Sequence, residues 1–137
     1  MLRIAIAEDE EKHLKAIIKE VTAYKKNEIN IVSNNGYELL MALQTVKQLP
    51  DILLLDIKMP KMDGLILTQY ISFKHPSIKI IGVSSHSNEA LVTEVLSEGA
   101  CGFITKFFLH RASAIYQGTY GSRNILVESI DAALENK

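Results

Sequence analysis

The stretch ILLLDIKMPKMDG, residues 52–64, decides the fold because an uninterrupted apolar run in it ends on Asp56. An apolar run without polar alternation is typical of a strand that is buried on both faces of a parallel sheet. After Asp56, Met59-Pro60 forces an extended turn and Asp63-Gly64 supplies a second turn. The stretch therefore predicts a strand that carries Asp56 into a loop held by two turns.

Short apolar runs and amphipathic stretches alternate along the rest of the chain. The strand-like runs are Leu2–Ala7, Ile29–Val32, Asp51–Asp56, Ile78–Val83 and Gly102–Thr105. Apolar residues recur at helical spacing between the runs and after the last one, at Leu14–Val21, Tyr37–Gln44, Leu65–Lys74, Leu91–Leu96 and 124–137. Strands that alternate with helices indicate an α/β fold, a doubly wound parallel sheet with helices on both faces.

Composition narrows the class of protein. The chain has 137 residues, a formal net charge of -1 and 47% hydrophobic residues, which fits one ordinary globular domain without a nucleic-acid binder's basic surface. No apolar stretch approaches the roughly 20 residues that span a bilayer, and the N-terminus has no signal-peptide pattern. Cys101 is the single cysteine, which excludes an internal disulfide and a cysteine metal cluster. We expect a cytoplasmic protein that contacts neither membrane nor nucleic acid through this domain.

Polar residues follow four of the predicted strands. They are Glu8 and Asp9 after the first strand, Asp56 at the end of the third, Ser84 after the fourth and Lys106 after the fifth. Ligands of open parallel sheets bind beyond the carboxyl ends of the strands. We therefore expect these side chains to converge on one rim.

The residue types at this rim point to phosphoryl transfer. Three neighbouring carboxylates repel one another and stay charged only beside a cation, and an oxygen-rich cluster suits magnesium. A hydroxyl and an ammonium opposite them suit a phosphoryl group, whose charge metal and lysine neutralise. Asp56 is the central carboxylate and the natural nucleophile, forming an aspartyl phosphate.

With these motifs in order, the chain resembles the receiver domain of two-component response regulators over almost its whole length, and we expect residues 1–137 to form one such domain. The resemblance implies a five-stranded flavodoxin-like sheet in the order 2-1-3-4-5. It implies that Asp56 accepts the phosphoryl group and that magnesium binds to Glu8, Asp9, Asp56 and the backbone carbonyl of Lys58. The family pattern also gives roles to Ser84, which follows the phosphoryl group, Lys106, which pairs with it, and Phe103, whose rotamer is coupled to phosphorylation.

Two features depart from the family pattern. Phe107 follows Lys106 where most receivers have proline, which puts the usual cis peptide in doubt. An atypical insertion at about 107–123 then precedes the last helix, where typical receivers have only a few residues. It either packs against apolar surface of its own domain or forms a contact surface, for example for a homodimer. In receivers such contacts usually lie on the output face, which consists of the fourth helix, the fifth strand and the fifth helix. In another interpretation, Phe108–Tyr116 is the fifth helix and the terminal stretch is a sixth.

The leading functional hypothesis is a phosphorylation-dependent signalling switch. A sensor histidine kinase or phosphotransfer protein would donate the phosphoryl group to Asp56, and the domain would not be an enzyme. The alternatives are a phosphorylation-independent pseudo-receiver that serves as an interaction module, and an aspartyl-phosphate phosphohydrolase. The second is disfavoured because Lys58 stands where such enzymes usually need a carboxylate. The chain is either a single-domain relay or part of a longer regulator, commonly a transcription regulator that binds DNA.

Overall fold

The computed structural model describes residues 2–23, 27–59, 61–85, 89–106 and 125–135, and for 125–129 it describes the backbone alone. The strands are β1 Leu2–Ala7, β2 Asn27–Ser33, β3 Ile52–Asp56, β4 Lys79–Ser84 and β5 Gly102–Thr105. The helices are α1 Glu11–Thr22, α2 Gly36–Thr45, α3 Gly64–Lys74, α4 Glu89–Ser97 and α6 Ile125–Glu135. The predicted insertion at 107–123, with its alternative helix and the Lys106–Phe107 peptide bond, lies outside the described residues.

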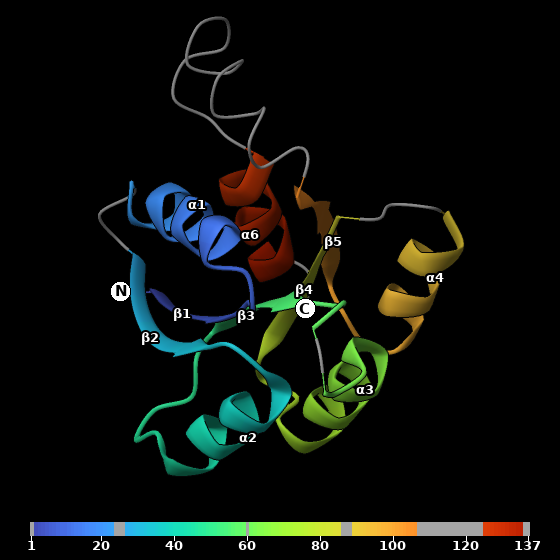
Figure 1. Ribbon diagram of the computed structural model, residues 1–137, viewed down its shortest axis with the longest axis horizontal. Coiled ribbons are helices and arrows are strands. Elements are labelled where there is room, and N and C mark those ends of the chain that lie inside the picture. The colour runs from blue at the N-terminus through green and yellow to red at the C-terminus, as the bar shows by residue number, and fades with distance from the viewer. Residues whose placement is uncertain (1, 24–26, 60, 86–88, 107–124, 136–137) are drawn as a thin grey trace, which may run out of the picture.

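The five strands form one parallel sheet in the order β2-β1-β3-β4-β5, which confirms the predicted fold (Figure 1). β3 lies at the centre, and its five residues are all buried. It pairs with β1 from Ile4↔Ile52 to Ala7↔Leu55 and with β4 from Ile52↔Lys79 to Asp56↔Val83. This central place explains the lack of polar alternation in the run, because both faces of β3 are covered.

Helices cover both faces of the sheet and create two apolar cores. In Figure 1, α1 and α6 lie on one side and α2, α3 and α4 on the other. The first core contains Ile17 and Val21 of α1 and Ile130 of α6 against Ile4, Ile6, Leu54 and Ile81 of the sheet. The second contains Leu39 of α2, Ile71 of α3 and Val95 of α4 against Ala5, Leu53, Leu55 and Ile80. Alternate residues of β1, β3 and β4 thus enter opposite cores.

Local sequence signals start and stop the helices. The side chain of Asn35 caps α2 by accepting a hydrogen bond from the Glu38 amide (2.9 Å). Gly99, two residues after α4, has a φ of +121°, a conformation that favours glycine. None of the described helices is long and apolar enough to cross a membrane.

Asp63-Gly64 differs from the expectation of a second turn. The Asp63 carboxylate accepts a hydrogen bond from the Leu65 amide (2.8 Å), so Asp63 is the N-cap of α3 and Gly64 is its first residue. A β-carbon on Gly64 would lie 2.6 Å from the α-carbon of Ile57. Glycine is therefore needed here because α3 begins in close contact with the backbone that follows Asp56. The left-handed residue in this loop is Lys61, with a φ of 72°.

Candidate phosphoacceptor site

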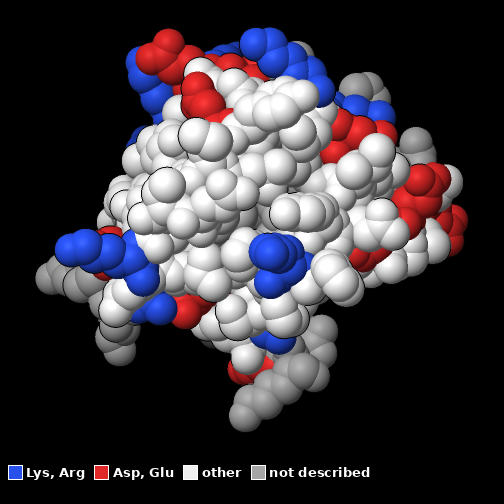
Figure 2. Space-filling model, turned by 90° about the horizontal axis from the view of Figure 1, so that it is seen from below, with Lys and Arg blue, Asp and Glu red and all other residues white. Residues whose placement is uncertain are grey.

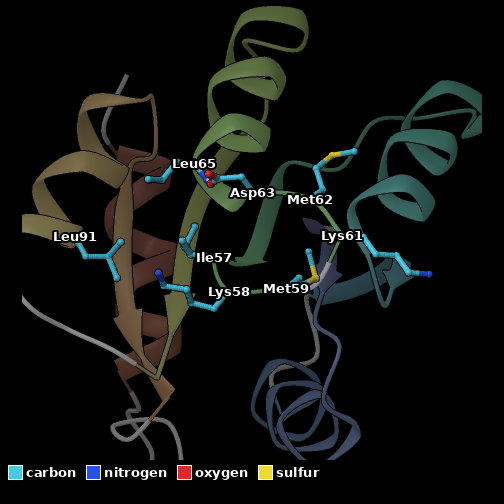
Figure 3. A pocket seen from close by; sticks show the side chains of 8 residues that line it. All are labelled: Ile57, Lys58, Met59, Lys61, Met62, Asp63, Leu65 and Leu91. Carbon is cyan, nitrogen blue, oxygen red and sulfur yellow. The ribbon is translucent and has the colours of Figure 1, made fainter.

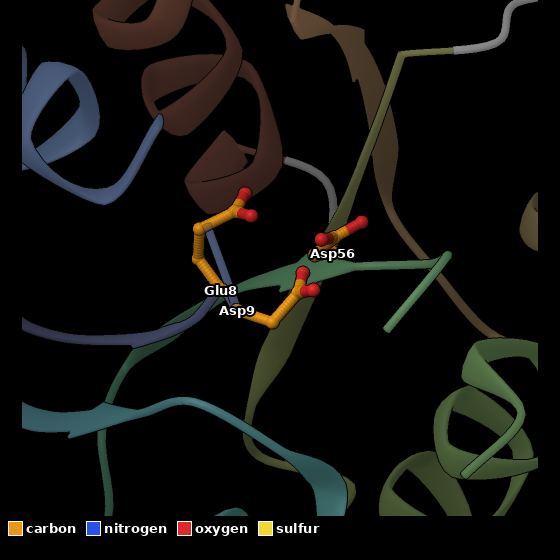
Figure 4. Close-up of side chains that lie close together, drawn as sticks. All are labelled: Glu8, Asp9 and Asp56. Atoms are coloured by element: carbon orange, nitrogen blue, oxygen red, sulfur yellow. The ribbon is translucent and has the colours of Figure 1, made fainter. Parts of the chain in front are cut away.

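The predicted carboxylates meet at the carboxyl edge of the sheet. Glu8 directly follows β1 and Asp56 ends β3, and these two strands are neighbours. The Glu8 amide donates to the carbonyl of Ser33 at the end of β2 (2.9 Å), which continues the sheet pairing by one residue. One carboxylate oxygen from each of Glu8, Asp9 and Asp56 lies within 4.8 Å of the other two. The three side chains are drawn in Figure 4. Glu8 and Asp56 are buried, whereas Asp9 is exposed at the rim.

Lys106 reaches the carboxylates from β5, the strand at the edge of the sheet. It follows β5, and its long side chain extends past β4 to reach the ends of β1 and β3. The Lys106 ammonium donates to Glu8 Oε2 (2.9 Å) and to Asp56 Oδ2 (3.0 Å). Only 6% of the Lys106 side chain is exposed, so both ion pairs are shielded from water.

Burial and crowding raise the pKa values of two of the acids. The pKa of Asp56 lies above its usual value, chiefly because burial disfavours the carboxylate and also because Glu8 is close. The pKa of Asp9 is also raised, by partial burial of its carboxyl group and by the neighbouring Asp56 carboxylate. For Lys106, burial alone would lower the pKa, but hydrogen bonds to Glu8 and Asp56 hold it above its usual value. The ammonium thus stays charged and does not fully compensate the acids.

The donor set fits a hard divalent cation. Glu8 Oε1 is buried and has no hydrogen-bond partner among the described residues, whereas Glu8 Oε2 accepts from Lys106 and from the Glu10 amide (3.1 Å). A buried carboxylate oxygen without a partner is costly unless a cation or water meets it. With oxygens of Asp9 and Asp56 nearby, the chemistry is that of magnesium ligands.

Ser84 and Lys58 lie close to Asp56, whereas Phe103 packs against the core. Ser84 is fully buried at the end of β4, one residue beyond Val83, the register partner of Asp56. The Lys58 amide donates to Asp56 Oδ1 (3.0 Å), and the Lys58 side chain is exposed. Phe103 lies on β5 in register with Gly82 of β4, and it packs against the core beneath α2, α3 and α4.

Sequence reasoning missed the supports of this loop. The Ile57 amide donates to the Val83 carbonyl (2.9 Å), which extends the β3–β4 pairing beyond Asp56. Gly64 lets α3 approach the backbone of Ile57, as described above. The backbone hydrogen bond of Ile57 could not be predicted from side-chain types. Gly64 was a usable signal, but this glycine was attributed to a turn and not to the close approach of α3.

A cavity of about 460 Å³ adjoins the site. It lies between the β3–α3 loop and α4, with Leu91 of α4 on one side in Figure 3. Its lining consists of Ile57, Lys58, Met59, Lys61, Met62, Asp63, Leu65 and Leu91. Because Ile57 and Lys58 directly follow Asp56, the cavity wall and the carboxylate cluster share one loop.

Comparison with known proteins agrees with this geometry. The profile of the family described as "Response regulator receiver domain" matches residues 4–114. The chemotaxis protein CheY of Listeria monocytogenes is 35% identical over 108 residues, which are 79% of this chain and 88% of the relative. The transcriptional regulatory protein LnrK of Bacillus subtilis is 31% identical over 107 residues, 77% of this chain but 47% of the regulator.

Solved structures have the same fold. A DNA-binding response regulator of the LuxR family from Staphylococcus aureus superposes with a TM-score of 0.76 at 24% identity, over 97% of this chain and 98% of the other. CheY in the CheX–CheY–BeF3–Mg complex of Borrelia burgdorferi has a TM-score of 0.71 at 26% identity, over 84% of this chain and 89% of the matched chain. The chain thus belongs to the response regulator receiver domain family.

Proposed function

We propose that this chain is a phosphorylation-dependent signalling switch whose phosphoacceptor is Asp56. The observation that carries the proposal is the buried Asp56 carboxylate, which ends the central strand between a lysine ammonium and two further acids. Receiver domains are signalling modules that work with histidine kinases and phosphotransfer proteins. The phosphoryl donor we propose is the phosphohistidine of such a protein. Phosphorylation of this chain would serve signalling and not the turnover of a metabolite.

The reaction is a displacement at phosphorus. An oxygen of the Asp56 carboxylate forms a bond to phosphorus while the bond to the donor's imidazole nitrogen breaks, and the nitrogen takes up a proton. Magnesium, held by Glu8, Asp9, Asp56 and the Lys58 carbonyl, would neutralise charge on the transferring oxygens. Lys106 already donates to Asp56 Oδ2, and its ammonium can move to a phosphoryl oxygen. The Lys58 amide orients the carboxylate through Oδ1.

The readout we propose uses β4, which pairs with β3, and β5, which pairs with β4. Ser84 ends β4 next to Thr105, its register partner on β5, and its hydroxyl would follow the phosphoryl group. Phe103 lies two residues before Thr105 on β5, and a β-carbon on Gly82 would come within 3.3 Å of its ring. Glycine at position 82 leaves room for the Val95 side chain, whose Cγ1 would lie 2.8 Å from such a β-carbon, and for the Phe103 ring, whose placement would bias a two-state element.

Intact-mass spectrometry after incubation with acetyl phosphate and magnesium tests the proposal. We expect one phosphoryl adduct on the parent, none when the metal is chelated, and none on Asp56→Asn. Asp51→Asn is the matched control, because Asp51 lies at the opposite end of β3, bonded to the Arg3 amide (2.8 Å). An adduct that persists in Asp56→Asn would assign the phosphoryl group to another residue and end the proposal.

A further inference from the structure

The outer surfaces of α2 and α3 carry large apolar side chains that no described part of the chain covers. On α3, Ile66, Tyr70 and Phe73 follow one another at helical spacing and are 61%, 44% and 85% exposed. On α2, Tyr37 and Met41 are one turn apart and are 59% and 64% exposed. We call these five side chains the α2–α3 face.

This face is also poor in charge. Glu38 is the single charged residue of α2, and Lys74 is the single charged residue of α3. Figure 2 views the molecule from this side, where a broad uncharged area has most charged groups at its edge and a basic group near its middle. The opposite side of α3 is apolar as well, with Leu67 and Ile71 in the core. A helix that is apolar on both sides is typical of one that is covered on both sides.

The size of the face matches one half of a protein interface. A large aromatic side chain has about 150–250 Å² of surface, so the exposed fractions correspond to roughly 600 Å² of mainly apolar area. A stable interface of standard size takes about 800 Å² from each partner, of which about 60% is apolar.

We propose that the α2–α3 face is the interface of a homodimer, in which a second copy of this chain covers the same face. A two-fold interface places each patch against itself, so a patch with strong charge of one sign repels its copy. The five side chains of this face are uncharged, α2 and α3 together carry one acid and one base, and the whole chain has a formal net charge of -1, so two copies meet without net repulsion. Apolar area of the required size and electrical neutrality together favour a second copy over a charged partner.

The dimer does not depend on phosphorylation. The five side chains of the α2–α3 face are exposed without any change at Asp56, so Asp56→Asn is expected to associate as the parent does. Loss of phosphoryl transfer and loss of association are therefore separate results, and the proposed phosphoacceptor and the proposed dimer can fail independently.

Sedimentation equilibrium of the full chain up to about 0.3 mM, without phosphodonor, tests this inference. We expect a dimer for the parent and for Asp56→Asn. Phe73→Glu and Ile66→Glu should each weaken association by at least about 30-fold, the size of a hot-spot substitution, because each is present twice in the dimer. Both positions are mostly exposed, so circular dichroism and thermal melting of the variants should match the parent.

Matched controls place glutamate on other exposed apolar positions. Leu134→Glu on α6 (39% exposed) and Leu96→Glu on α4 (44% exposed) should leave association unchanged. A parent that stays monomeric at the highest concentration overturns the inference. So does a dimer that survives Phe73→Glu and Ile66→Glu, or one that only Leu96→Glu disrupts, because the contact would then lie on another surface.

Discussion

Lys106→Met should destabilise the domain strongly in the absence of metal. The Lys106 ammonium lies within hydrogen-bond distance of both buried acids, Glu8 (2.9 Å) and Asp56 (3.0 Å). Methionine fills a similar volume but removes the charge and both bonds. The two carboxylates are then left together, almost completely buried and without a cation.

The magnitude follows from burial and from the number of bonds lost. The side chains of Glu8 and Asp56 are 0% and 2% exposed, and removal of one partner from a buried ion pair costs about 3–5 kcal/mol. The pKa of Asp56 is already raised in the parent, so uptake of a proton by this acid limits the loss. We expect about 3 kcal/mol at pH 7, which for a domain of this size lowers Tm by about 10 °C.

Urea unfolding at pH 7 with a chelator measures the loss, and Lys19→Met on the exposed surface of α1 is the control, expected within about 0.5 kcal/mol of the parent. The deficit of Lys106→Met should shrink as the pH falls toward the usual range of aspartate, because protonation removes the repulsion. Magnesium should stabilise Lys106→Met more than the parent. A variant as stable as the parent at pH 7, or a deficit that does not change with pH, would refute the reasoning.

Three further predictions address the same site. Magnesium at ten times its Kd should stabilise the parent by about 1.4 kcal/mol. In thermal melts, the increase in Tm caused by magnesium should be smaller for Asp9→Asn than for the parent. An equal increase would show that Asp9 is not part of the metal site. Asp56→Asn without metal should be as stable as the parent or more stable, by about 1 kcal/mol at pH 7. Because the pKa of Asp56 is raised in the fold, the native state binds more protons between the usual and the raised value, and stability falls as pH rises through that window. The advantage of Asp56→Asn should therefore vanish in acid, and an advantage that grows there would contradict this account. Gly64→Ala should cost at least about 2 kcal/mol in urea unfolding, since its β-carbon would lie 2.6 Å from the Ile57 α-carbon; a neutral effect would show that α3 can move away.

Much of the fold could be predicted from the sequence because its signals are local. The run that became β3 is apolar at consecutive positions because both of its faces are buried. Such a run can be recognised directly in the sequence. The bounds of β2 were less clear: the predicted Ile29–Val32 became Asn27–Ser33, since pairing with β1 extends the strand into polar residues. Strand order depends on contacts between distant segments and came from family resemblance, not from periodicity.

The convergence of the candidate residues could be predicted from the sequence, but their contacts could not. Polar residues at four strand ends indicated the convergence of Glu8, Asp9, Asp56 and Lys106, because parallel strands end at one edge. The ion pair between Lys106 and Glu8 was not foreseen, since it depends on how far a side chain reaches past β4. Gly64 was assigned to a turn because a sequence shows a glycine but not the backbone that approaches it.

Chemical mapping of the phosphorylated residue tests the central claim most directly. Borohydride reduces an acyl phosphate to an alcohol, so an aspartyl phosphate becomes homoserine at its own position in the chain. After treatment with acetyl phosphate and magnesium, then borohydride and proteolysis, peptide sequencing by mass spectrometry should find homoserine at position 56 and at no other aspartate. Homoserine at position 9, or a phosphate on Ser84 that borohydride leaves intact, would contradict the assignment of Asp56 as the phosphoacceptor.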